Sequence, residues 1–181
     1  MIEPKKDIKR LMESKEFKAW RDSHKDSYLS DFFCILDDDS SKDNTWQIDF
    51  YNPSDDTLTS FELPVDMRKK CRLKESESKI FKHEKENVDK LDISKVKLTD
   101  KEAISSAKKK LNDNHKGETP TKTILVLQHN KEHKMAIWNI TMMTSSLNLF
   151  NAKLDASSGI LLDYSLKSAM SLKKEIFSGK A

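Results

Sequence analysis

Residues 152–161 read AKLDASSGIL, two strand-forming runs that flank a short polar turn. The Asp155 side chain is suited to bonding nearby backbone amides, and Gly159 can adopt a positive φ angle without strain. We therefore expect residues 147–154 and 160–166 to pair as an antiparallel hairpin across this turn.

A helix and two further strands are predicted before this hairpin. Residues 99–102 read TDKE and match the capping box, in which the Thr99 hydroxyl and the Glu102 carboxylate satisfy amides at a helix start. Apolar side chains then mark one face of the helix, at Ile104, Ala107 and Leu111. Residues 112–117 close it. Strand-forming runs follow at residues 123–128 and 136–142.

The first half of the chain shows the same order. Pro4 suits a helix start, and apolar side chains at helical spacing continue to about His24. Residues 28–36 are rich in aromatic and branched side chains, as is typical of a strand. Two more strands are predicted, one from the alternation at residues 46–51 and one at residues 57–63, before Pro64.

Residues 68–97 change in composition to Lys, Glu and Ser without a clean apolar period. We interpret them as a charged connector that holds a helical stretch around residues 76–90, with Ile80 and Val88 touching the body. The predicted domains are therefore residues 1–67, 68–97 and 98–181. A short C-terminal helix is expected within residues 168–181.

The two halves resemble each other loosely. Trp46-Gln47-Ile48 and Trp138-Asn139-Ile140 occupy like positions, which favours a degenerate duplication. The alternative is that any two α+β segments look alike at this level. The predicted fold class is α+β, with tandem units of a helix followed by a three- to four-stranded antiparallel sheet. Whether both units join in one sheet is left open.

The second unit resembles a PepSY domain, the module of protease propeptides and of some bacterial spore-germination and membrane proteins. The resemblance rests on the helix start KLTDKEAI at residues 97–104, followed by Ala107, and on AKLDASSGIL at residues 152–161. It covers residues 95–167. It implies a PepSY/cystatin-like helix packed across an antiparallel sheet, and a role in binding or restraining another protein rather than in catalysis.

Composition and cysteine content suggest an intracellular protein. With 36% hydrophobic and 35% charged residues, three Trp and eight Phe, the chain has enough apolar surface for a core. The N-terminal residues do not match a signal peptide, and no run approaches the roughly 18 to 20 apolar residues of a membrane helix. We expect a cytoplasmic protein without a membrane partner, with Cys34 and Cys71 as free thiols.

Charge is distributed unevenly along the chain. Residues 1–67 carry a net charge of −7, residues 68–116 carry +7, and residues 117–181 carry +3. The basic side chains that could contact phosphates are Arg68, Lys69, Lys70, Arg72 and Lys74. Interleaved glutamates reduce the positive field, and Phe81 is the one aromatic residue nearby that could stack on a base. Nucleic-acid binding is therefore the alternative to protein binding.

Metal and cofactor sites find little support. His129, Glu132 and His133 could hold a metal, but a solvated turn explains them better. Asp37, Asp39, Ser41 and Asp43 have the spacing of a calcium loop. That loop would place Lys42 where glycine is needed and Ile48 where a bidentate carboxylate is needed. We expect neither a metal nor a cofactor.

Enzymatic activity is also not expected. The glycines are Gly117, Gly159 and Gly179, so a glycine-rich phosphate loop cannot form. A small hydrolase is the remote alternative, with Asp49, Tyr51 or Asp163 lining one face of the sheet. The prediction from sequence is a non-enzymatic protein-binding or regulatory module whose sheet faces contact the partner.

Overall fold

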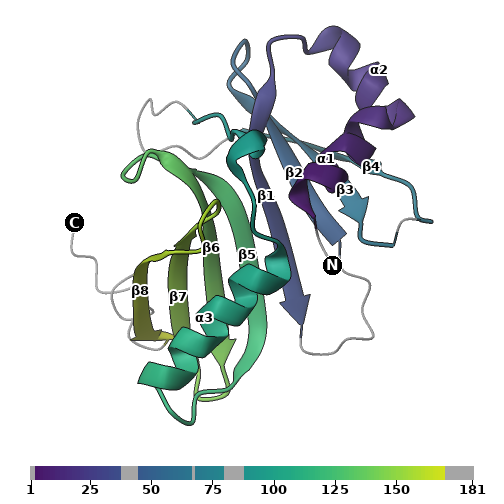
Figure 1. Ribbon diagram of the computed structural model, residues 1–181. Coiled ribbons are helices and arrows are strands. Elements are labelled where there is room, and N and C mark those ends of the chain that lie inside the picture. Colours follow the sequence, from purple (N-terminus) through teal and green to yellow (C-terminus); the bar gives the residue numbers. More distant parts are fainter. Residues whose placement is uncertain (1–2, 38–44, 67, 80–87, 170–181) are drawn as a thin grey trace.

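The computed structural model describes residues 3–37, 45–66, 68–79 and 88–169 (Figure 1). The helices are α1 (Pro4–Glu13), α2 (Lys15–Ser23) and α3 (Asp100–Asn114), with a short 3-10 helix, η1 (Ile93–Lys95). The first four strands are β1 (Tyr28–Asp37), β2 (Thr45–Asn52), β3 (Thr57–Pro64) and β4 (Arg72–Lys79). The last four are β5 (Pro120–Asn130), β6 (Met135–Thr144), β7 (Asn148–Asp155) and β8 (Leu161–Ser168). The predicted α+β class is confirmed.

The strands form one antiparallel sheet in the order β4-β3-β2-β1-β5-β6-β7-β8. β1 and β5 pair at its centre, from Asp31 opposite Gln128 to Asp37 opposite Lys122. The question that the sequence left open is thereby answered, because both halves of the chain contribute strands to the same sheet.

The hydrophobic core lies between one face of this sheet and helices α1, α2 and α3. Strand alternation sends Phe32 and Cys34 of β1, with Leu125 and Leu127 of β5, to that face, where all four are buried. The Trp46 and Trp138 rings lie 6.2 Å apart over this central pair of strands, and neither side chain is more than 1% exposed. One continuous cluster of apolar side chains therefore joins the two halves.

The predicted helix from Pro4 to His24 is two helices. Ser14 adopts an extended conformation between α1 and α2, and its hydroxyl accepts a hydrogen bond from the Phe17 amide at 3.1 Å. This is N-cap geometry, which starts a new helix. The break turns Ile8 and Leu11 of α1, together with Phe17, onto the core.

The prediction of a charged connector at residues 68–97 is wrong for residues 72–79, which form the edge strand β4. Within Ser76–Lys79, where a helix was expected to begin, Ser78 and Lys79 pair with Leu58 and Thr57 of β3. Edge strands tolerate charged side chains and need no continuous apolar face, so this strand lacked the periodicity used to recognise the others. Residues 80–87, in the rest of the expected helix, lie outside the described residues, as do residues 170–181 of the expected C-terminal helix.

The capping box and the final turn are confirmed. The Thr99 amide donates to Glu102 Oε2 at 2.8 Å, and the Glu102 amide donates to Thr99 Oγ1 at 3.3 Å. In the turn from β7 to β8, the Gly159 amide donates to the Asp155 carbonyl at 2.8 Å, and Gly159 has a φ angle of 77°.

We expect Gly159→Val to lower the free energy of unfolding by about 2 kcal/mol, because a β-branched residue is strained at positive φ. A Cβ atom at this position would also lie 3.1 Å from Leu98 Cδ2. Gly117→Val separates the two causes, because Gly117 also has a positive φ angle, 95°, but no atom lies within 4 Å of an added Cβ, so it should lose only the part due to backbone strain. Urea denaturation measures both variants. An unchanged midpoint for Gly159→Val would contradict the account of the turn.

Candidate functional site

The sheet has a second face, which no helix covers in the part of the chain that the structure describes. We call it the helix-free face. Alternation along each strand assigns to it the side chains that point away from the core. They include Asp31, Phe33, Ile35, Gln47, Asp49, Ser60, Lys74, Ile124, Val126, Gln128, Asn139, Thr141, Asn151, Lys153 and Asp163.

A pair of aspartates lies near the centre of this face. Asp31 of β1 stands directly opposite Asp49 of β2. The alignment depends on a β-bulge between Leu29 and Asp31, which shifts the register by one residue at Ser30. The Ser30 hydroxyl lies 2.8 Å from Asp31 Oδ2 and 3.0 Å from the Asp49 carbonyl oxygen, so it helps to hold the bulge.

The two carboxyl groups stand opposite each other and each affects the pKa of the other, and a hydrogen bond between them would require a proton on one of them. Burial raises the pKa of Asp31 to about 7, and the neighbouring Asp49 charge adds to this effect. Burial also raises the pKa of Asp49. Hydrogen bonds from Ser60 and Gln47 and the positive charge of Lys74 lower this pKa, but by less than burial raises it. The pair therefore retains a proton close to neutral pH, unlike ordinary surface aspartates.

An apolar strip runs beside the aspartate pair. Phe33, Ile124 and Val126 are half-buried, and Ile35 is 43% exposed. These four side chains lie on the paired central strands β1 and β5, where Phe33 is opposite Val126 and Ile35 is opposite Ile124. The strip is thus continuous across the junction of the two halves.

Polar side chains border the strip on the β6 and β7 side. Asn151 Nδ2 lies 2.8 Å from Asn139 Oδ1 and 2.8 Å from Thr141 Oγ1, and Lys153 pairs with Asp163 at 3.4 Å. On the other side, Lys74 donates to Gln47 Oε1 at 3.0 Å. An apolar centre with a polar rim is the usual composition of a protein-contact surface.

The basic residues predicted from sequence lie at one edge of the sheet. All five are exposed: Arg68, Lys69, Lys70, Arg72 and Lys74. Arg68 makes two hydrogen bonds to the Asp66 carboxylate, at 3.0 and 2.9 Å, so its charge is partly balanced. Arg72 and Lys74 belong to the edge strand β4, where charged side chains also oppose unwanted strand pairing.

The residues considered for a hydrolase do not come together. Asp49 lies on β2 and Asp163 on β8, with four strands between them, while the Tyr51 hydroxyl donates to Asp56 Oδ1 at 2.6 Å. The carboxylate that does meet Asp49 is Asp31, which the sequence reasoning missed. The feature of the sequence that could have indicated Asp31 is an acidic residue inside the otherwise largely apolar strand β1.

The other sequence candidates form no site in the described part of the chain. His129 lies near the end of β5, and the His133 amide bonds to Asn130 Oδ1 in the following turn. No group of three or more His, Cys, Asp or Glu side chains among the described residues could hold a metal ion. Of the calcium-loop candidates, Asp37 ends β1, whereas Asp39, Ser41 and Asp43 lie outside the described residues.

Both cysteines are free, as predicted, and both are buried. Burial raises the pKa of the Cys34 thiol to about 12 and also raises that of Cys71. Since the thiolate is the reactive form, neither cysteine is suited to act as a nucleophile.

Comparison with known proteins identifies a solved structure of similar fold but does not indicate a function. No protein-family model matches the chain, and no curated protein matches it either. A solved structure with a similar fold comes from Clostridium difficile 630, where the protein is called a "putative lipoprotein". The two chains are 15% identical with a TM-score of 0.50, over 87% of this chain and 98% of the other. Among the described residues, no helix combines the length and the apolar composition needed to cross a bilayer.

Proposed function

We propose that this protein is a non-catalytic protein-binding module and that it contacts its partner through the helix-free face. The observation that carries the proposal is the apolar strip on β1 and β5 beside the Asp31–Asp49 pair. Uncovered apolar side chains on a sheet are costly to keep in water, and their usual role is to contact another protein. A carboxyl pair with raised pKa values is also costly and is typical of functional surfaces.

The same face indicates what the partner presents. Phe33, Ile35 and Val126 would pack against apolar side chains of the partner. A partner Lys or Arg placed over Asp31 and Asp49 would favour loss of their shared proton, and the resulting ion pair would be shielded from water. We therefore infer a partner segment that combines apolar residues with one basic residue.

We further propose that the two halves are duplicated PepSY-like units. The strand order supports this proposal, since each half contributes four consecutive strands and the two sets meet at β1 and β5. Each set follows a helical segment in the chain. Trp46 and Trp138 also lie on the second strand of their respective sets. A binding role is what the PepSY resemblance implies.

The proposal predicts that Ile35→Glu weakens partner binding at least thirty-fold, because it places a charge in the contact strip. The partner would first be isolated on the immobilised wild-type protein from native extract, then purified and titrated by calorimetry. Ile160→Glu is the matched control, since Ile160 is 63% exposed in the turn before β8, away from the strip. Equal affinities of the two variants for the purified partner would contradict the proposed surface.

Nucleic-acid binding is the alternative, supported by the five exposed basic side chains near β4. It predicts retention on heparin or DNA that falls steeply with salt. Reversal of Lys69, Lys70 and Arg72 to Glu should then abolish the retention. Retention that survives this reversal would eliminate the basic segment as the contact.

A further inference from the structure

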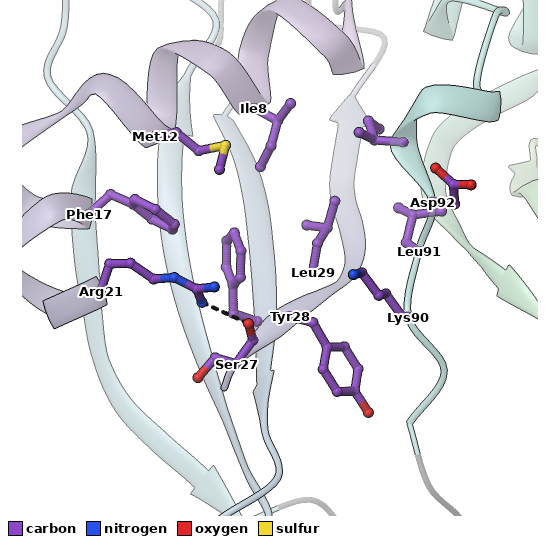
Figure 2. Close-up of a pocket in the computed structure, with 12 residues that line it drawn as sticks. Ile8, Met12, Phe17, Arg21, Ser27, Tyr28, Leu29, Lys90, Leu91 and Asp92 are labelled. Carbon is purple, nitrogen blue, oxygen red and sulfur yellow. Dashed lines mark hydrogen bonds between the residues drawn. The ribbon is translucent and has the colours of Figure 1, made fainter. Parts of the chain in front are cut away.

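A pocket of about 560 Å³ lies on the core side of the sheet, opposite the helix-free face. It opens between α1 and α2 on one side and strand β1 with residues 90–93 on the other (Figure 2). Its volume falls within the range of small-molecule pockets. Because it lies on the other face of the sheet, it can be tested independently of the protein-binding proposal.

The pocket wall is mainly apolar, and its apolar residues belong to α1, α2, β1, β2 and the segment of residues 90–93. The apolar lining side chains are Ile8, Met12, Phe17, Leu29, Phe50, Leu91 and Ile93. Met12 is 51% exposed at the opening, where a flexible thioether side chain adapts to ligands of different shape. The wall is therefore suited to an aliphatic chain.

Two cations line the same pocket. Figure 2 shows the Arg21 guanidinium and the Lys90 ammonium reaching toward it from opposite sides. Arg21 Nη1 lies 2.7 Å from the Ser27 carbonyl oxygen and 3.1 Å from the His24 carbonyl oxygen, and these bonds orient the guanidinium. Neither cation forms an ion pair with a carboxylate among the residues that the structure describes.

One acidic residue also lines the pocket. The Asp92 carboxylate accepts hydrogen bonds from the Ser94 amide and hydroxyl, at 3.1 and 2.6 Å, and pairs with Lys95 at 3.6 Å. In Figure 2 this carboxylate points away from Arg21. Asp92 thus has its own partners, and within the described part of the chain it forms no ion pair with Arg21 or Lys90.

We propose that this pocket binds a single-chain carboxylate amphiphile, such as a fatty-acid anion. The aliphatic chain lies against Phe17, Leu29 and Phe50, and the carboxylate meets Arg21 and Lys90. Since Nη1 of Arg21 bonds to the backbone, the guanidinium edge formed by Nε and Nη2 is the one that can bind a carboxylate with two parallel hydrogen bonds. Lys90 adds a second positive charge. The aliphatic chain of the ligand would be buried against the apolar side chains of the pocket, and its carboxylate would pair with the two cations.

The test titrates the full chain with dodecanoate by calorimetry, below the concentration at which micelles form. We expect saturable binding at one site. Dodecanol and dodecyltrimethylammonium have the same chain length but lack the anionic head group, so we expect each to bind at least ten-fold more weakly. Equal binding of either compound, or no saturable binding of dodecanoate, would overturn the proposal.

Variants locate the site. Lys90→Gln should weaken dodecanoate binding about three-fold, and Arg21→Gln with Lys90→Gln should weaken it at least ten-fold. Met12→Trp, at the exposed opening, should weaken it by partly filling the pocket. Lys109→Gln on the exposed side of α3 is the charge-matched control and should have no effect.

Folding is checked separately by circular dichroism and thermal unfolding, because Arg21 also bonds to the backbone. If the double variant does not fold, Lys90→Gln and Met12→Trp decide the question. Lys90 makes no structural bond among the described residues, and Met12 is half exposed. Wild-type affinity in both single variants would overturn the assignment.

Discussion

At pH 8, replacing Asp31 with asparagine is expected to raise the free energy of unfolding by about 2 kcal/mol, because it relieves the repulsion within a buried carboxyl pair. In the wild-type protein, the two carboxyl groups stand opposite each other on β1 and β2. The introduced asparagine amide has nearly the same shape as the carboxyl group and can still donate to Asp49, without a second negative charge.

The effect depends on pH in a defined direction. Burial raises the pKa of Asp31 from its ordinary 3.8 to about 7, so the folded protein holds this proton more tightly than the unfolded chain. The group therefore stabilises the fold below about pH 4, and this contribution is lost as the pH rises to about 7. The difference in pKa corresponds to at most about 4 kcal/mol, and we expect about half, because Asp31 is only partly buried.

The groups around the pair set the size of this effect. Ser30 lies next to Asp31, Gln47 and Ser60 bond to Asp49, Lys74 adds a positive charge from β4, and neutral Gln128 is the β5 neighbour. None of these neighbouring groups is removed by Asp31→Asn.

Urea denaturation between pH 4 and pH 8 measures the difference between wild type and variant. The two curves should nearly coincide at pH 4 and separate steadily toward pH 8. Asp163→Asn, an exposed carboxylate in an ion pair on the same face, is the control and should stay within about 0.5 kcal/mol of wild type. A variant that is less stable than wild type at pH 8 would refute the shared-proton account.

Replacing Trp138 with Ala is expected to lower the free energy of unfolding by about 3 to 5 kcal/mol, the usual cost of truncating a fully buried large aromatic side chain. Trp138 is completely buried, contacts the Trp46 ring and donates from Nε1 to the Leu98 carbonyl at 3.4 Å. The substitution thus removes packing at the junction of the two halves as well as a hydrogen bond to the segment before α3.

The tryptophan contact also tests whether the two halves unfold together. In a double-mutant cycle of Trp46→Phe and Trp138→Phe, we expect a coupling energy of about 1 kcal/mol. Near-ultraviolet and far-ultraviolet circular dichroism should report one common transition for each protein. Separate transitions, or a loss below about 1 kcal/mol for Trp138→Ala, would show that the junction does not stabilise the whole sheet.

Features that depend on neighbouring residues were predictable from the chain. The Thr99–Glu102 capping box, the turn with Gly159 at positive φ and the alternation in β2 and β6 need only local hydrogen bonds, backbone sterics and a buried face. The missed features have different causes. Ser14 interrupts a helix whose apolar spacing continues past it, and the side chains of β4 do not alternate because an edge strand buries little.

The candidate surface was only partly predictable. The sequence indicated antiparallel sheets, and hence uncovered sheet faces, and it identified Asp49 as a polar residue within a strand. It could not indicate that Asp31 is opposite Asp49, because a bulge at Ser30 shifts the register by one residue and such a shift moves side chains between faces. The sequence also could not indicate that Arg21 and Lys90 line the same pocket, because four strands, β1 to β4, separate these two residues along the chain.

Apart from the break at Ser14 and the edge strand β4, the order of elements, their approximate bounds and the turn at residues 155–159 therefore follow from the local sequence, since short-range propensities and periodicity determine them. The joining of β1 to β5 in one sheet, the meeting of Trp46 with Trp138 and the Asp31–Asp49 pair were decided by the tertiary structure. Each depends on contacts between residues far apart in the chain, and strand register and burial, which set those contacts, exist only once the whole sheet has formed.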